Sequence, residues 1–109
     1  MTEEIKVNRS SGNVFADLGL DNSDELVVKA ELAYKISSII TKLGITQVEA
    51  AKLLGIDQPK ISALINGKLS DFSTVRLFRF LNSLGRDVEI VVKDKPKSRS
   101  QALTQVVSR

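Results

Sequence analysis

The chain has 109 residues, of which 42% are hydrophobic, and it contains neither cysteine nor histidine; it can bury one modest core, and two domains would not fit. Without these residues there is no disulfide framework or thiolate zinc site, and the commonest metal ligand and general base are missing, so we expect no cofactor, no metal and no enzymatic activity. Since we find no signal sequence or membrane-spanning apolar run, we expect a cytoplasmic protein that does not engage a membrane.

Charge is unevenly distributed along the chain. Residues 1–33 carry seven acidic and three basic side chains, net −4, whereas residues 34–109 carry thirteen basic and six acidic ones, net +7. The overall charge of +3 is therefore concentrated in the C-terminal part, as contact with phosphate requires.

Residues 1–22 form an acidic N-terminal segment that also contains a short apolar patch, made by Val14, Phe15, Leu18 and Leu20. The segment is too short to fold alone. We expect it either to pack on its own domain or to dock onto a partner.

A first helix is predicted from about Ser23 to Leu43, opening a domain that spans residues 23–93. Its apolar residues recur at helical spacing, and Gly44 ends the pattern. We expect this stripe to face the core: Leu26, Ala30, Ala33, Ile36, Ile40 and Leu43.

A second helix is predicted to begin at Gln47, because Thr46 and Glu49 have the spacing of a capping box. Gly55 is expected to end it, since glycine tolerates the positive φ of a tight turn. Ala51 places only a methyl group where another helix must approach closely, and an apolar stripe is expected at Ala50, Leu53 and Leu54.

A third helix follows directly, with Ile56 filling the angle between the two helices. Asp57 can cap it, and Pro59 stands in its first turn, where a missing N–H costs little. Ile61, Leu64 and Ile65 are expected to point inward. The outward face is then short, polar and uncharged, and consists of Gln58, Pro59, Ser62, Ala63 and Asn66.

A last helix is predicted from Ser73 to Ser83 or Leu84. Its apolar residues cover more than one side, so part of its burial is expected from the core and the rest from a second chain. These residues are Val75, Leu77, Phe78, Phe80, Leu81 and Leu84.

A β-strand is predicted after Gly85, where Val88, Ile90 and Val92 alternate with mainly polar residues. A lone strand needs a partner, and pairing with the same strand of a second copy is the simplest choice. Pairing with the N-terminal run 5–7 or with another protein's sheet stays open. The homodimer interface is thus predicted at Phe80, Leu84, Val88, Ile90 and Val92.

Residues 94–109 are rich in basic residues, serine and glutamine, and are expected to form a mobile basic tail.

The second and third helices have the layout of a helix-turn-helix. Their spacing resembles the Xre or lambda-repressor-like family at Gln47, Ala51, Gly55, Ile56, Ile61 and Leu64. The resemblance implies a mainly α fold: a lambda-repressor-like bundle of about four to five helices with one C-terminal β-strand. Pro59 departs from the family pattern, because many of these repressors carry a polar base-reading side chain there. An ordinary helical hairpin is the alternative, but it would not need both the small Ala51 and an uncharged outer face.

This layout predicts sequence-specific binding of double-stranded DNA, with the third helix in the major groove of an operator palindrome. Base-reading contacts are predicted from Gln58, Pro59, Ser62, Ala63 and Asn66. Phosphate contacts are predicted from Thr46, Gln47, Lys60 and Lys68.

Over roughly residues 10–93, including the long first helix and the Xre-type motif, the chain looks like the short HigA-like antitoxins. The features that carry this resemblance are the opening 12–20, the run 71–73 before the last helix, and the terminal strand. The resemblance implies a repressor that also neutralises a basic RelE or HigB-type ribonuclease toxin, with contacts from Phe15, Asp17, Leu18, Asp21 and Glu25. A repressor without a toxin, stand-alone or phage-type, and an interaction adaptor that has lost DNA binding are the alternatives.

Overall fold

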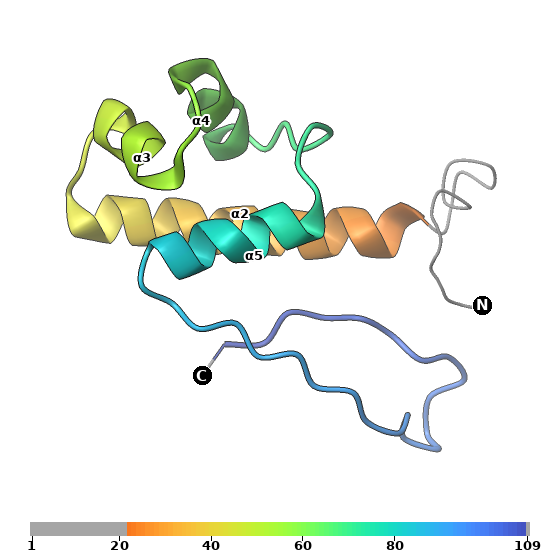
Figure 1. Cartoon of the computed structure of the whole chain (residues 1–109). Coiled ribbons are helices and arrows are strands. Elements are labelled where there is room, and N and C mark those ends of the chain that lie inside the picture. Colours follow the sequence, from red (N-terminus) through yellow and green to blue (C-terminus); the bar gives the residue numbers. More distant parts are fainter. Residues whose placement is uncertain (1–21, 109) are drawn as a thin grey trace.

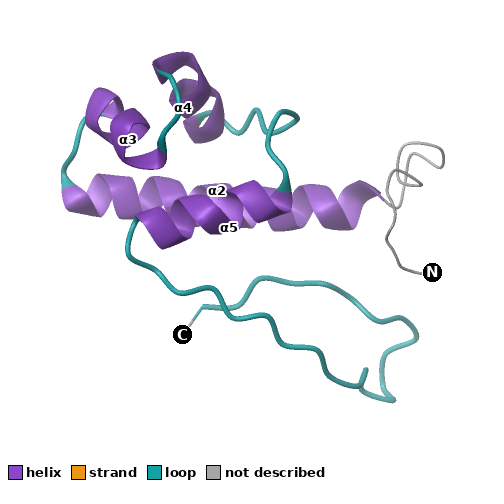
Figure 2. Cartoon of the chain, in the orientation of Figure 1, coloured by secondary structure: helices purple, strands orange, loops and turns teal. Residues whose placement is uncertain are grey.

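The computed structural model describes residues 22–108, which form four helices and the loops around them (Figures 1 and 2). They are α2 (Asn22–Leu43), α3 (Gln47–Leu54), α4 (Gln58–Ile65) and α5 (Thr74–Ser83). α2 packs against α5 and α4, and α3 packs against α4 and α5. The short helices α3 and α4 therefore sit together on a base made by α2 and α5 (Figure 1).

The predicted helices are confirmed, and the predicted bounds agree with the observed ones to within one residue. The expected β-strand at 88–92 is not seen in the single chain, because residues 22–108 contain no strand. Residues 86–96 instead form a loop after α5. The alternation of side chains is present in the sequence, but a strand forms only when a neighbouring segment completes its hydrogen-bond ladder.

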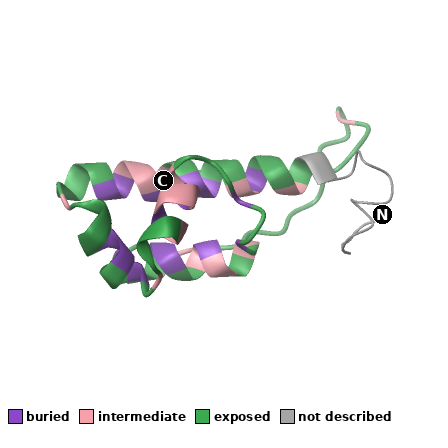
Figure 3. Cartoon of the chain, turned by 90° about the horizontal axis from the view of Figure 1, so that it is seen from above, coloured by how far each residue is buried: buried purple, intermediate pink, exposed green. Residues whose placement is uncertain are grey.

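The buried face of α2 differs in part from the expected stripe. Ala33, Ile36 and Ile40 are buried as predicted, whereas Leu26, Ala30 and Leu43 are exposed. Figure 3 shows buried and exposed positions following one another along α2. The buried positions missed by the sequence analysis are Val28, Leu32 and Ile39. α2 carries apolar residues on several sides, so periodicity alone could not decide which side faces the other helices.

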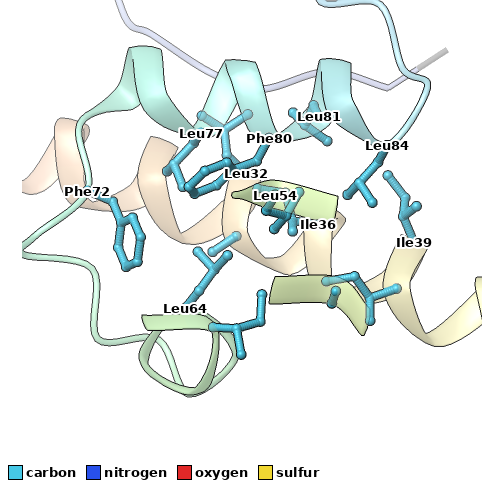
Figure 4. Close-up of a cluster of buried hydrophobic side chains, with 14 of the residues drawn as sticks. Leu32, Ile36, Ile39, Leu54, Leu64, Phe72, Leu77, Phe80, Leu81 and Leu84 are labelled. Carbon is cyan, nitrogen blue, oxygen red and sulfur yellow. The ribbon is translucent and has the colours of Figure 1, made fainter. Parts of the chain in front are cut away.

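The core lies where the four helices meet, and its fully buried large side chains are Phe72, Ile36, Ile61, Leu64 and Leu77. Figure 4 labels Phe72, Ile36, Leu64 and Leu77 among the side chains of this core. The rings of Phe72 and Phe80 pack edge to face, with 5.9 Å between centroids. This arrangement matches the quadrupoles of the two rings. The loop before α5 is thus fixed to the same core as the helices.

Two residues expected in a dimer interface are buried within the single chain. Phe80 is 4% exposed and Leu84 is 6% exposed, both as part of the core cluster. Their intramolecular packing accounts for their burial, so the reason for placing them against a second chain is removed. The exposed apolar residue of α5 is Val75.

The chain after α5 forms an arm, residues 86–108, that runs away from the helices and then turns back (Figure 1). Gly85, with φ of 80°, opens it, and the Arg86 N–H donates to the Leu81 carbonyl at 2.9 Å. Val88 and Val106 pack against the core at the two ends of the arm. Mobility of residues 94–109 stays a prediction.

The reversal of the arm is formed by its own side chains. Lys95 Nζ donates to the carbonyls of Pro96 at 3.3 Å and Arg99 at 2.6 Å. The Arg99 guanidinium in turn donates to the Gln101 carbonyl at 3.0 Å. Within residues 22–108, none of the helices is both long and apolar enough to cross a membrane.

We expect Leu77→Ala to lower the free energy of unfolding by about 2–5 kcal/mol, because it leaves a cavity where Leu77 is 0% exposed. Urea denaturation followed by circular dichroism measures the loss. Leu53→Ala is the matched control: Leu53 is 48% exposed, so its loss should be below about 1 kcal/mol. Equal losses in the two variants would contradict the core described above.

Candidate nucleic-acid interface

α3 begins with the predicted capping box. The Glu49 N–H donates to the Thr46 hydroxyl at 3.1 Å, and the Thr46 N–H donates to Glu49 Oε1 at 2.8 Å. Both bonds satisfy N–H groups that the first turn of a helix leaves without a helical partner. Gln47, the first helical residue, is exposed beside this cap. The start of α3 is therefore rigid and accessible, as a phosphate contact requires.

The turn between α3 and α4 depends on Gly55, which has φ of 72°. The Gly55 N–H donates to the Lys52 carbonyl at 3.3 Å, and the Ile56 N–H donates to the Ala51 carbonyl at 3.0 Å. This pair of bonds is the Schellman pattern of a helix end. Ile56 is half-buried against the core, as predicted, so the turn sets the angle at which α4 leaves α3.

One residue of α3 that was predicted to face inward is exposed. Ala50, Ala51 and Leu54 are buried, but Leu53 is 48% exposed. The buried arc is centred among these three residues, and at about 100° per residue Leu53 lies about 100° from its centre. The small Ala51 lets another helix approach closely on its own side of α3, so the contact surface lies away from Leu53.

α4 begins at Gln58 with the predicted cap. The Lys60 N–H donates to Asp57 Oδ1 at 2.9 Å, and Pro59 stands in the first turn. Gln58 and Pro59 are both exposed. Since the cap fixes the backbone here, the Gln58 side chain projects from a rigid helix start.

Further along α4 the predicted outer face is only partly open. Ser62 and Ala63 are half-buried, and Ala63 packs against the core. Ala63 was expected to face outward, and its position at the border of the core corrects that expectation. Asn66 is exposed, and its Nδ2 lies 3.4 Å from the Ser62 hydroxyl as a donor. Ser62 and Asn66 are thus linked by a hydrogen bond at the end of α4, whereas Gln58 lies at its start.

The two lysines that are predicted to contact phosphate lie near the two ends of α4. Lys60 is half-buried in the first turn, and Lys68 is exposed just beyond the helix. The Lys68 N–H donates to the Ala63 carbonyl at 2.8 Å, so its backbone is held to the end of α4.

Arg76 was not singled out by the sequence analysis. Its guanidinium carbon lies 5.4 Å from the Phe72 ring centroid and 5.6 Å from that of Phe80. Ser73 caps α5 by accepting from the Arg76 N–H at 3.1 Å. The geometry gives Arg76 a packing role over the two rings. The sequence carries little sign of this, because Phe72 precedes the helix in which Arg76 lies.

Comparison with known proteins bears on this geometry. The family model described as a helix-turn-helix domain matches residues 14–93. A solved structure named as an XRE family transcriptional regulator is 45% identical to the chain, with a TM-score of 0.78, and the match covers 81% of this chain and 99% of that one. This chain belongs to the XRE family of helix-turn-helix transcriptional regulators. No curated protein is significantly similar to it.

The family assignment agrees with the position of the helix-turn-helix at α3 and α4, inside the matched range. The match also includes residues 14–21, which lie outside the described residues, as do four of the five predicted toxin contacts. The fifth, Glu25, is half-buried on α2. Residues 94–109 lie beyond the family model.

We expect Gly55→Ala to destabilise this XRE-family protein by roughly 1–2 kcal/mol, the cost of a left-handed conformation for a residue with a Cβ. Nothing lies within 4 Å of the added Cβ, so the cost is conformational rather than a clash. Gly55→Asn is the control, because asparagine adopts this conformation more readily. Thermal unfolding should rank the variants glycine, asparagine, alanine, and an equal loss for both would refute this reason.

Proposed function

We propose that this XRE-family protein is a sequence-specific repressor that binds an operator palindrome in double-stranded DNA as a homodimer. The observation that carries the proposal is the start of α4, where the uncharged residues Gln58 and Pro59 are exposed and the Asp57 cap and the Gly55 turn fix the backbone. A helix with small outer residues can enter the major groove, where base edges present distinct patterns of donors and acceptors.

Base reading is proposed to rest on Gln58 and Asn66, with smaller contributions from Pro59, Ser62 and Ala63. Gln58 has an amide that can pair with two atoms of one adenine edge. Asn66 already donates to Ser62, and it keeps its amide oxygen and one N–H for a base. Pro59 can offer only apolar contact and shape, and the half-buried Ala63 can reach no further than its methyl group.

Phosphate contact is proposed for Thr46, Gln47, Lys60 and Lys68. The first two stand at the start of α3, where the helix dipole favours an anion; the capping bonds leave the Thr46 hydroxyl hydrogen and the exposed Gln47 amide as donors. The lysines lie at the two ends of α4, so they would bracket the helix in the groove. Such contacts fix the orientation of the protein on the duplex but carry no sequence information.

A dimer is proposed because one small module buries only roughly 600–1,000 Å² on DNA. Two modules about 34 Å apart would read both halves of a palindrome. The exposed apolar residues of the arm support a second copy as the partner: Ile90 is 72% exposed and Val92 is 92% exposed. Val88 is half-buried at the base of the arm and would join the same surface.

We expect Gln58→Ala to weaken binding to the protein's own operator by about 1–3 kcal/mol and to relax preference at one base position. Lys60→Ala serves as the contrast, since loss of a phosphate contact should weaken binding to all duplexes and reduce the salt slope by about one unit. Fluorescence anisotropy with a promoter duplex and a scrambled duplex, at several salt concentrations, measures both effects.

Two results would count against this proposal. Equal loss of affinity for both duplexes in Gln58→Ala would refute base reading by Gln58. No preference of the unaltered protein for the promoter duplex at any salt concentration would refute sequence-specific repression, and would favour an interaction adaptor that has lost DNA binding.

We further propose that this repressor is an antitoxin that binds a basic ribonuclease of the RelE or HigB type. The supporting observation is an exposed apolar surface on α2 next to the predicted contact Glu25. Leu26 is 53% exposed, Val27 is 52% exposed and Tyr34 is 74% exposed. Exposed apolar side chains of this size on one helix are a feature of many protein-binding surfaces. Phe15, Asp17, Leu18 and Asp21, which lie outside the described residues, are proposed as further contacts.

Co-purification with the product of the neighbouring gene tests the antitoxin role. We expect the full chain to retain a basic toxin, and a chain lacking residues 1–22 to lose it while keeping its affinity for DNA. A DNA-binding protein that retains no toxin in either form would leave a stand-alone or phage-type repressor. Full retention by the shortened chain would refute the proposed contacts.

A further inference from the structure

Residues 86–94, the first half of the arm, expose three consecutive large apolar side chains. Ile90 is 72% exposed, Val91 is 62% exposed and Val92 is 92% exposed, although residues 22–108 contain no strand. We propose that this segment pairs antiparallel with its counterpart in a second copy, in one register, with Ile90 on the twofold axis. The inference rests on the homodimer of the proposed function and adds the register that defines it.

The apolar positions favour this register. In a symmetric antiparallel pair, a centre at Ile90 places Ile90 opposite itself and Val88 opposite Val92 of the other copy. Residues directly opposite each other lie on the same face of the pair, where β-branched side chains pack well. Val88 is already packed against the core of its own chain. The apolar face of the pair would thus continue the core of each copy.

The charged positions agree with the same register. Asp87 falls opposite Lys93, and Arg86 falls opposite Asp94 of the other copy. The Arg86 guanidinium donates to the Leu84 carbonyl at 3.2 Å, and it keeps further N–H donors for a carboxylate. Opposite charges then meet at both ends of the pair, where cross-strand pairs of this kind are stabilising. This self-complementarity indicates a second copy of this chain as the occupant.

The neighbouring symmetric registers fit less well. A centre at Glu89 would place two carboxylates directly opposite each other, which is destabilising. A centre at Val91 would pair Glu89 with Lys93 and Asp87 with Lys95, but Lys95 already donates to the carbonyls of Pro96 and Arg99 in the turn of the arm. This register would also set the Asp94 carboxylate opposite Val88, beside the core, with Arg86 of the other copy only as a diagonal neighbour, so the carboxylate would lose solvation without a direct partner. The centre at Ile90 avoids both costs.

Cysteine cross-linking tests the register directly, because the chain contains no cysteine of its own. A cysteine replacing the residue on the axis would lie opposite its counterpart, with Cα atoms about 4.5–5.5 Å apart, within the range of a disulfide. A cysteine one position along would lie about 7–8 Å from its counterpart, which is too far. We expect Ile90→Cys to give at least about tenfold more covalent dimer than Val91→Cys under mild oxidation.

Charge reversal gives an independent readout. We expect Asp87→Lys to weaken dimerisation about tenfold in sedimentation equilibrium, because the substitution creates two like-charge pairs in each dimer. Lys93→Asp should do the same, and the chain that carries both substitutions should regain the original affinity. Lys97→Ala, in the turn of the arm, is the control and should change nothing.

The outcomes separate the register from the dimer. Preferential cross-linking through Val91→Cys, or failure of the double substitution to restore affinity, would overturn the register while leaving a dimer. A protein that sediments as a monomer at all concentrations and cross-links through neither position would overturn both the register and the homodimer. The promoter-duplex experiment would still decide DNA binding by itself.

Discussion

Burial of Ile61 and Leu64 in the core of the bundle is the constraint on which the rest of the structure depends. Both side chains are essentially inaccessible, and they hold α4 against α2, which it contacts directly. Because α4 is only eight residues long, it would be marginal as an isolated helix. Its position, and therefore the direction in which Gln58 points, comes from packing rather than from helix propensity.

Local hydrogen bonds then fix the ends of the helices that core packing has positioned. Side chains at Thr46, Asp57 and Ser73 each accept an N–H three residues on, and the turn at Gly55 sets the angle between α3 and α4. Each of these devices is worth about 1 kcal/mol. The Asp57 cap and the Gly55 turn fix the backbone at the start of α4, so less conformational entropy would be lost there when the helix binds DNA.

The arm joins the core to the proposed second copy. Val88 packs on the core of its own chain, while Ile90 and Val92 a few residues later are exposed. A dimer built on this segment would couple the spacing of the two α4 helices to the end of α5, because the arm begins where that helix ends. Cooperation between half-sites would then depend on the same core that holds each α4.

The sequence alone determined the helices, their caps and the Gly55 turn, because these depend on interactions between residues no more than five apart. It also indicated the XRE family, whose motif is local. It did not determine which side of α2 is buried, that Leu53 is exposed and Ala63 half-buried, or that Phe80 and Leu84 belong to the chain's own core. Those features depend on contacts between distant segments. The strand at 88–92 is absent from residues 22–108 for the same reason, because a strand requires a neighbouring segment and its own sequence cannot say whether one is present.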